Sequence, residues 1–483
     1  MGRPEEAAGS QQPGTGGRLS LQLAAAMASS LACATNSNAV GWGVVATWQL
    51  RQTTDEPDGN TGDLQLSDDQ RAWINSALYL GGAFGCLLGG QASVRFGPRL
   101  AMLYSLLPIA LGQVMVALAS NALVLLAGRL VIGLTSGISC GVYVLYISGT
   151  SSPQYRGTLT VLADVICLLV IIGAIALGEV LNWRWLAAVC AVVSLLPTAT
   201  MLLLLPDDPV WLLSCGRLSD AKRSAAAFCL ELELSDTTTL DSTNDGSWRQ
   251  SLNHIFQRKN LIPLGIVLML ILFNSFSGYM AILSYSLEFF RLAGFQLDAA
   301  VCSILFCVIR VLAVLLTSTV IDRLGRRLLL IFSCGGVSVC YLGLAVYFHL
   351  PALHHLSALP IVLIMGAGFV YSSALACVPF CLAGEMFPMR TRQLDGAVVM
   401  FCCNVFNMLA GQAFPRTLAA FGASGLFLTH AVIMALACAF TLAAVPETKG
   451  LSLAAIETLF EGDATRSVSD GNKTVSRDAE RRV

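Results

Sequence analysis

The stretch RLGRR at residues 323–327 separates two long apolar runs, and an earlier stretch, RFGPR at residues 95–99, separates two others in the same way. Two more pairs of short polar stretches repeat along the chain: YRG (155–157) with TRQ (391–393), and PDDPVWL (206–212) with PETKGLSL (446–453). Each pair follows the corresponding apolar run of its half. The sequence therefore predicts two six-helix halves in parallel orientation, a duplication typical of rocking transporters with a site between the halves and not needed in a channel.

The composition is that of a membrane protein. Of the 483 residues, 55% are hydrophobic and only 12% are charged, and the mean hydropathy is +0.70. Soluble proteins usually carry about 25% charged residues. The net charge of −1, without a basic domain, gives no indication of a nucleic-acid partner.

Apolar runs long enough to cross a bilayer, which takes about 20 residues, occur twelve times along the chain. They are residues 20–46, 71–91, 100–119, 122–147, 158–180, 184–205, 261–286, 299–321, 328–349, 357–383, 395–418 and 422–445. We therefore predict an all-α membrane protein with twelve transmembrane helices in two six-helix bundles. We expect no cleavable signal peptide before the first run.

Basic residues in the short loops predict which side faces the cytosol. The outer loop 48–70 holds six carboxylates and one arginine. With the N-terminus inside, the short inner loops instead hold eight arginines: Arg95, Arg99, Arg156, Arg323, Arg326, Arg327, Arg390 and Arg392. Five segments follow from this orientation. They are a disordered cytosolic tail (1–19), the N-terminal bundle (20–205), a cytosolic linker with short helices (206–260), the C-terminal bundle (261–447) and a cytosolic tail (448–483).

Six motifs in this order resemble the sugar porters, the glucose- and trehalose-facilitator branch of the major facilitator superfamily. They are GRLVIGL (128–134), YRGTL (155–159), PDDPVWLLSCGR (206–217), IDRLGRRLLL (321–330), GEMFPMRTR (384–392) and PETKGLSLAAIE (446–457). The resemblance covers nearly all of residues 20–460. It implies alternating access by the two bundles, with a small solute, such as a sugar or polyol, bound between them in the lipid bilayer.

Charged residues at the inner helix ends are candidates for a cytosolic gate, because ion pairs there can form when that side closes and must separate when it opens. The N-terminal half is depleted: Val94, Pro98 and Gly149 stand where the family carries charged residues. We therefore expect a cytosolic gate that has fewer ion-pair partners in the N-terminal half and is weaker there. The alternative is that the arginines only determine the orientation of the helices in the membrane. The gating candidates, to which the resemblance adds Tyr285, are Arg95, Arg99, Arg156, Asp207, Tyr285, Asp322, Arg326, Arg327, Glu385, Arg392 and Glu447.

The positions that the resemblance assigns to the substrate differ from the family pattern. The seventh span reads NSFSGYM (274–280) instead of the family's amide-rich motif, and an aspartate and an arginine stand where the family has amides in the fifth and eighth spans. The candidate substrate-binding residues are Asp164, Asn274, Ser275, Met280, Arg310, Phe380 and Asn404. Because each lost hydrogen-bond partner costs about 1–3 kcal/mol, ordinary glucose binding is not implied.

Three functions stay open at this point. The first is facilitated transport of a sugar or polyol through a remodelled site. The second is transport of another small solute, charged and coupled to protons, and the third is a sensor without transport. The first span, residues 20–46, contains no carboxylate, which favours passive flux.

The sequence gives no sign of an enzyme. The sixteen cysteines are scattered along apolar runs and are interpreted as packing residues, and the five histidines have no metal-site spacing. We expect no cofactor, no metal and no obligate protein partner. The only glycosylation motif, NKT (472–474), lies in the cytosolic tail, and no acidic dileucine signal occurs in residues 1–19. These features favour the plasma membrane.

Arg310 lies at the midpoint of the apolar run 299–321. An arginine at the bilayer centre costs roughly 2.5–3.5 kcal/mol on insertion scales, so it usually faces the protein interior and has a partner. Asp164 is the only carboxylate well inside the fifth span, and the family packs the fifth helix beside the eighth. We predict that the two side chains pair across the halves in one access state. The alternative is that Arg310 bonds backbone carbonyls while Asp164 is protonated.

Overall fold

The computed structural model describes residues 15–50, 64, 66–152, 155–230, 258–285, 298–353, 355–356, 358–387 and 392–449, and within these ranges the chain is almost wholly helical. The first half holds α1 (Thr15–Gln49), α2 (Asp68–Phe96), α3 (Pro98–Ala117), α4 (Ala122–Thr150), α5 (Arg156–Gly178) and α6 (Trp183–Leu204), followed by α7 (Pro209–Ser214) and α8 (Leu218–Phe228). The second half holds α11 (Arg258–Ser275), α12 (Tyr279–Ser284), α14 (Ala299–Leu324), α15 (Arg326–His349), η1 (Pro351–Leu353), α16 (Leu359–Ser373), α17 (Val378–Met386) and α18 (Arg392–Ala444).

The predicted all-α membrane fold with twelve passes is confirmed. Helices α1 to α6 form six passes. In the second half, α14 and α15 form one pass each, and α11 with α12 and α16 with α17 form two interrupted ones. The 53-residue α18 contains two passes that meet at Gly422, where φ is +66°. Among the described residues, eight helices are by themselves long and apolar enough to span a membrane.

Two spans that the sequence predicted to be continuous are interrupted. The predicted span 261–286 is divided after Ser275, and Gly278 in the gap has φ +78°, a conformation that does not continue a right-handed helix. The predicted span 357–383 is divided between Ser373 and Val378. A proline, Pro379, stands in the first turn of α17, where its missing N–H costs little.

The repeated motif RFGPR/RLGRR has the same backbone conformation in both halves. Gly97 ends α2 and begins α3 with φ 87° and ψ 154°, and Gly325 ends α14 and begins α15 with φ 89° and ψ 158°. A positive φ of this size is accessible to glycine and rarely to other residues. The same turn therefore connects the second to the third pass and the eighth to the ninth.

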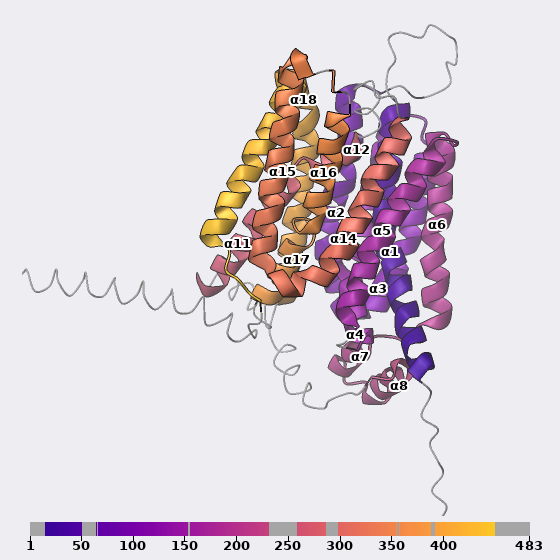
Figure 1. Cartoon of the computed structure of the whole chain (residues 1–483). Helices are drawn as coiled ribbons and strands as arrows, with labels where there is room; N and C mark the ends of the chain where they lie inside the picture. The colour runs from indigo at the N-terminus through magenta and orange to yellow at the C-terminus, as the bar shows by residue number, and fades with distance from the viewer. Residues whose placement is uncertain are drawn as a thin grey trace, which may run out of the picture.

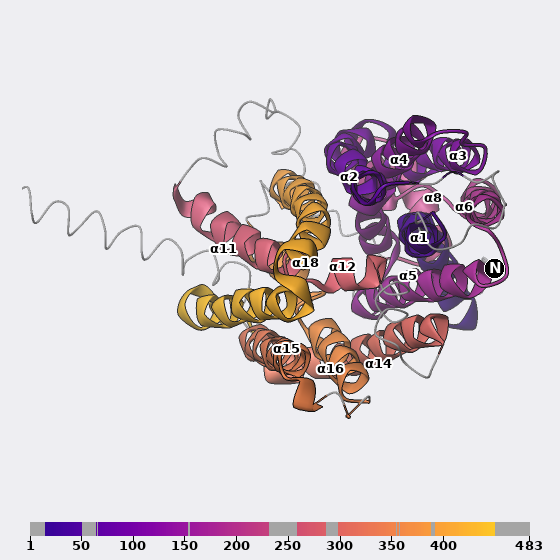
Figure 2. The ribbon, with the colours of Figure 1, turned by 90° about the horizontal axis from the view of Figure 1, so that it is seen from above.

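The two halves lie side by side, with their helices running in a common direction (Figures 1 and 2). Helices α7 and α8 lie together at one end of the first half (Figure 1). We call this the α7–α8 end and the other the opposite end. Caps by Ser67, Asn121 and Asn182 start α2, α4 and α6 at the opposite end.

Closely packed glycines join α2 to α4. A Cβ at Gly85 would lie 2.0 Å from the carbonyl oxygen of Leu134, and one at Gly133 would lie 2.2 Å from that of Leu78. These contacts are backbone to backbone, so no side chain can move aside to relieve them. Small residues at such spacing are typical of helix pairs in membranes.

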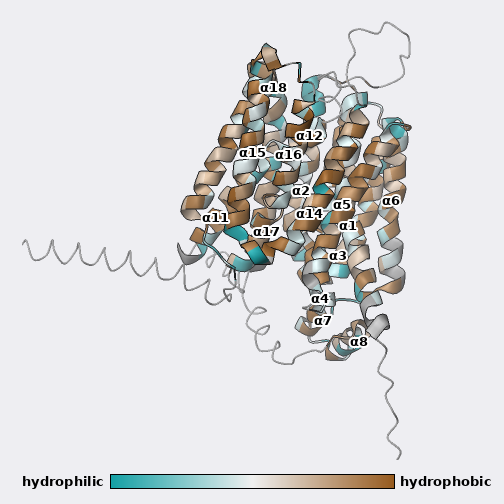
Figure 3. Cartoon of the chain, in the orientation of Figure 1, coloured by the Kyte–Doolittle hydropathy of each residue, from teal (hydrophilic) through white to brown (hydrophobic). Residues whose placement is uncertain are grey.

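The long helices consist largely of apolar residues, as the brown colour of much of the ribbon in Figure 3 shows, and many of these side chains are exposed. Five large apolar side chains on the helices illustrate this, each between 64% and 76% exposed: Leu111, Leu123, Trp185, Val192 and Val339. Soluble monomers rarely expose apolar surface on this scale. The interior, by contrast, buries polar groups such as Asn38, Arg129 and Arg310. This distribution is that of a multi-pass membrane protein with a polar interior.

Candidate substrate pathway between the two halves

Three helix pairs carry most of the contact between the halves: α5 with α14, α2 with α18, and α1 with α12. Figure 2 shows α14 beside α5, and α12 between α18 and α1. The predicted neighbourhood of the fifth and eighth passes is therefore present. A substrate that passes between the halves has to meet side chains of these helices.

Among the described residues, the hydrogen bond and the ring contact that hold Arg310 in the interior come from the second half. Arg310 is 7% exposed, its Nε donates to Ser372 Oγ on α16 at 2.9 Å, and its guanidinium carbon lies 4.1 Å from the centroid of the Tyr279 ring on α12. Its Nη1 is buried and has no hydrogen-bond partner within the described part of the chain. The planar cation is thus fixed in orientation by a hydroxyl and a cation–π contact, not by backbone carbonyls.

Asp164 lies on α5, half-buried, on the other side of the interface. It does not form an ion pair with Arg310 in this structure, although the two groups interact electrostatically. The predicted pairing is therefore not present in this access state. For other states it stays a prediction.

The Tyr279 ring that contacts Arg310 belongs to a stack of aromatic side chains. Tyr279 stacks on Tyr371 with 4.3 Å between ring centroids and on Phe306 at 6.2 Å. The Tyr371 hydroxyl donates to Asn274 Oδ1 at 2.8 Å. The candidate Asn274 therefore belongs to this layer, with its acceptor already used by a neighbouring tyrosine.

The other substrate candidates are divided between this layer and the helix contacts around it. Ser275 is buried, and its Oγ has no partner among the described residues. Phe380 is half-buried against the core. Asn404 instead faces α2: its Nδ2 lies 3.6 Å from Cys86 Sγ, and a Cβ at Gly82 would lie 2.8 Å from its Oδ1.

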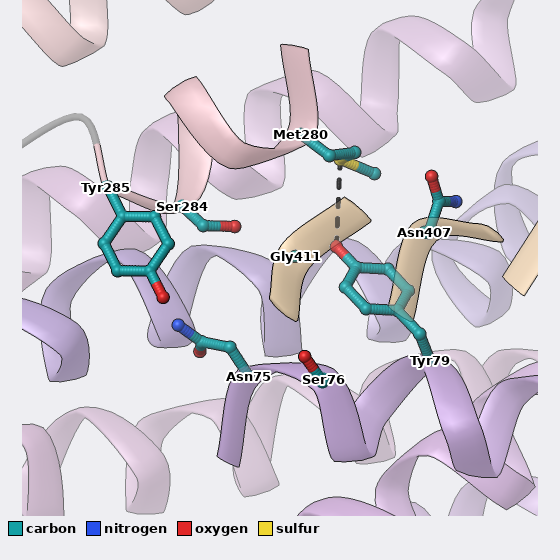
Figure 4. Close-up of a pocket in the computed structure, with 8 residues that line it drawn as sticks. All are labelled: Asn75, Ser76, Tyr79, Met280, Ser284, Tyr285, Asn407 and Gly411. Atoms are coloured by element: carbon teal, nitrogen blue, oxygen red, sulfur yellow. Dashed lines mark hydrogen bonds between the residues drawn. The ribbon is translucent and has the colours of Figure 1, made fainter. Parts of the chain in front are cut away.

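Met280 belongs to a cavity nearer the opposite end, between α2, α12 and α18 (Figure 4). The Tyr79 hydroxyl on α2 reaches across the halves to Met280 Sδ at 3.7 Å. Tyr285, a gating candidate, also lines the cavity and stacks on Phe414 at 5.5 Å. The complete lining is Asn75, Ser76, Tyr79, Met280, Ser284, Tyr285, Asn407 and Gly411.

Ion pairs at the α7–α8 end each join residues of one half, as far as the described side chains show. Arg99 pairs with Asp207 at 3.1 Å in the first half, and Arg326 pairs with Glu385 at 2.9 Å in the second. Glu447 accepts from the backbone N–H groups of Arg326 and Arg327 at 3.1 and 3.2 Å.

Of the other arginine and aspartate gating candidates, the structure describes one side chain. Arg95 is exposed and lies over the Phe96 ring. The side chains of Arg156, Asp322 and Arg392 lie outside the described part of the structure.

Asp208 occupies the space that a side chain at position 149 would need. A Cβ at Gly149 would lie 2.2 Å from Asp208 Oδ1. The same carboxylate caps α7 by accepting from the Val210 N–H at 2.9 Å. Burial raises the pKa of Asp208 to about 7. Hydrogen bonds from the backbone N–H groups of Val210 and Trp211 lower this pKa, and the neighbouring Asp207 raises it. The Asp208 carboxylate therefore packs directly against Gly149 of α4, at the position where the family carries a charged side chain.

Several side chains of the interior were not predicted from the sequence: Asn75, Ser76, Tyr79, Tyr371 and Ser372. Those on α2 follow a helical spacing inside an apolar run, which was an available signal. For Tyr371 and Ser372 on α16 the sequence carries no such signal, because nothing in the sequence of an apolar span shows which group a hydroxyl will bond.

This arrangement, two six-helix halves with polar and aromatic side chains between them, defines a multi-pass membrane protein of the major facilitator type. A family model described as "Sugar (and other) transporter" matches residues 24–460, so the chain belongs to this family. It is 27% identical to a facilitated trehalose transporter Tret1-2 homolog of Drosophila simulans, over 84% of this chain and 85% of the relative. It is 25% identical to the facilitated trehalose transporter Tret1 of Apis mellifera ligustica, over 94% and 91%. The partially occluded, inward-open xylose transporter XylE from E. coli shares the fold, with a TM-score of 0.74 and 16% identity over 90% of this chain and 100% of that one.

Proposed function

We propose that the protein carries a neutral sugar or polyol across the membrane by alternating access, as a facilitator that moves its substrate down a gradient. The family match and the names of the relatives support the substrate class. The observation that carries the proposal furthest is the layer of hydroxyl, amide and aromatic groups between the halves. Sugars are bound by such groups, through hydrogen bonds to hydroxyls and contacts of C–H faces with rings.

The first helix supports passive transport. Its amides are engaged inside the first half: Asn36 Oδ1 accepts from the Ser136 hydroxyl at 3.2 Å, and Asn38 Nδ2 donates to the Cys190 carbonyl at 3.2 Å. Amides do not titrate, so these positions cannot exchange protons during transport. On α5, at the contact with α14, Asp164 offers a titratable carboxylate.

The buried charge of Arg310 favours a second candidate. Its Nη1, which has no hydrogen-bond partner among the described residues, suits a solute that carries negative charge, and Asp164 on the facing helix could exchange a proton during the cycle. Proton-coupled transport of a charged solute is therefore the alternative. It differs from the first function by its dependence on a pH gradient.

For orientation, we propose that the α7–α8 end and both termini face the cytosol of the cell, at the plasma membrane. The clustering of arginines at this end supports the proposal. The halves meet around the Tyr79–Met280 contact near the opposite end, whereas the described ion pairs at the α7–α8 end stay within one half. This combination suits a state that is closed to the outside.

Uptake into proteoliposomes tests the function. Purified protein is reconstituted, and entry of labelled trehalose, D-glucose, D-xylose and sorbitol is measured with and without an inward proton gradient. We expect saturable entry of at least one of these solutes, to the same final level in both conditions. Accumulation above the external concentration, abolished by a protonophore, would favour the second candidate, and absence of entry and of binding for all four would contradict the proposal.

A further inference from the structure

The lining of the cavity in Figure 4 does not include Arg310, and it contains three polar side chains of α2: Asn75, Ser76 and Tyr79. They lie on one face of the helix and point toward the second half. Facing them are side chains of α12 and α18, among them Ser284 and Asn407. None of the eight lining residues is charged.

Two hydroxyls of this cavity have no strong hydrogen-bond partner. Ser76 is 1% exposed, and its Oγ has no partner among the described residues. The Tyr79 hydroxyl belongs to a side chain that is 8% exposed, and among the described residues it donates only to the Met280 thioether, a weak acceptor. Buried hydroxyls are nearly always hydrogen-bonded in native proteins. Two such groups side by side therefore point to a ligand that bonds them in another state.

The second half covers these groups in the present structure. A Cβ at Gly411 would lie 3.4 Å from Ser76 Oγ, so the backbone of α18 closes over the serine. Asn75 is fixed from behind, since its Nδ2 donates to Thr47 Oγ1 at 2.7 Å. The remaining space has room for about one water molecule. Separation of α2 from α12 and α18 would uncover all three polar side chains at once.

We propose that this cavity is the collapsed form of a subsite for a neutral, hydroxyl-rich ligand, in which Ser76 and Tyr79 bind hydroxyls of the sugar when the protein opens at the opposite end. The inference rests on the proposed function and assigns specificity to α2. The absence of charge in the lining favours a neutral sugar or polyol over an acid. The subsite exists only in the state that is open at the opposite end. Loss of the Ser76 and Tyr79 hydroxyls should therefore weaken entry of the sugar from that side.

The test compares Ser76→Ala, Tyr79→Phe and the double variant with a matched control, Tyr104→Phe, whose side chain on α3 is 62% exposed. Binding is read as the rise in Tm of purified protein with trehalose, D-glucose, D-xylose or sorbitol, which does not require transport. The Tm without ligand reports folding. A neutral hydrogen bond contributes about 0.5–1.5 kcal/mol, so each variant should bind the sugar roughly 2- to 12-fold more weakly, and the control should match wild type.

Sidedness gives the second readout. In proteoliposomes, the variants should raise the KM for entry from the opposite end by a similar factor and leave the KM from the α7–α8 end unchanged. Wild-type affinity in the double variant, or an equal rise in KM from both sides, overturns the subsite while leaving sugar transport intact. Failure of the wild-type protein to bind any of the four ligands instead contradicts the proposed function and the subsite with it.

Discussion

At the scale of single residues, the interior differs from the predicted site mainly in which side chains already bond to other side chains of the protein. Asn274 was expected to meet the substrate, yet its carbonyl oxygen accepts from Tyr371. Arg310 was expected to face a carboxylate, yet a serine and a tyrosine ring hold it. Hydroxyl and aromatic side chains are common in apolar spans, so the sequence does not show which of them surround a buried cation.

The relation between Asp164 and Arg310 is tested by a double-mutant cycle. If the two side chains pair in another access state, Asp164→Asn and Arg310→Gln each reduce transport, and the loss in the double variant is smaller than the sum by more than about 0.5 kcal/mol. Exchanging the two residues should restore part of the activity. Initial uptake rates at equal protein levels give the four corners of the cycle; additive losses would retire the pair.

The buried carboxylate of Asp208 predicts a pH dependence of stability. Burial raises its folded-state pKa from the ordinary 3.8 to about 7, so the folded state binds the proton more tightly than the unfolded chain. The contribution is complete below about pH 4 and is lost as the pH rises through about 7. We expect the Tm of the wild-type protein to fall between about pH 4 and 7.

The matched variant is Asp208→Asn, because asparagine can still cap α7 but does not titrate. Its Tm should fall less over the same window. Asp69→Asn, which removes an exposed carboxylate of α2, should leave the wild-type profile unchanged. A profile of Asp208→Asn that is parallel to that of wild type would contradict the assignment.

At the scale of helices, hydropathy and the repeated motifs were sufficient for the number, order and approximate bounds of the passes. They were not sufficient for the interruptions at Gly278 and between α16 and α17. An interrupted span keeps the same apolar composition as a continuous one. The break depends on packing: a Cβ at Gly278 would lie 2.2 Å from the His430 ring of α18, a contact between segments far apart in sequence.

The glycine contacts of α2 with α4 give a prediction at this scale. Gly85→Ala places a methyl group 2.0 Å from the Leu134 carbonyl oxygen, so the two helices must move apart. Overpacking of this kind costs typically about 1–3 kcal/mol. Gly265→Ala is the matched control on α11, since nothing lies within 4 Å of its added Cβ. Thermal unfolding in detergent should show a lower Tm for Gly85→Ala only, and equal Tm values would contradict the close packing.

At the scale of the whole molecule, the duplication visible in the sequence corresponds to two halves that contact each other through few helices. The first half contributes α1, α2 and α5 to the interface, and the second contributes α12, α14 and α18. The charged motifs at the α7–α8 end are arranged symmetrically, and the ion pairs formed there by described side chains join residues of the same half. The sequence identified these charged positions, whereas their partners depend on the access state, which no sequence pattern encodes.

Alternating access is tested most directly by counterflow. Proteoliposomes are loaded with unlabelled sugar and diluted into a trace of the same labelled sugar, with no ion gradient and with a protonophore present. A carrier that exposes one site alternately to each side should produce a transient accumulation of label above the external concentration, and protein-free vesicles should show none. Equilibration of label without an overshoot, as through a channel, or no entry in spite of measurable sugar binding, as for a sensor, would contradict the account.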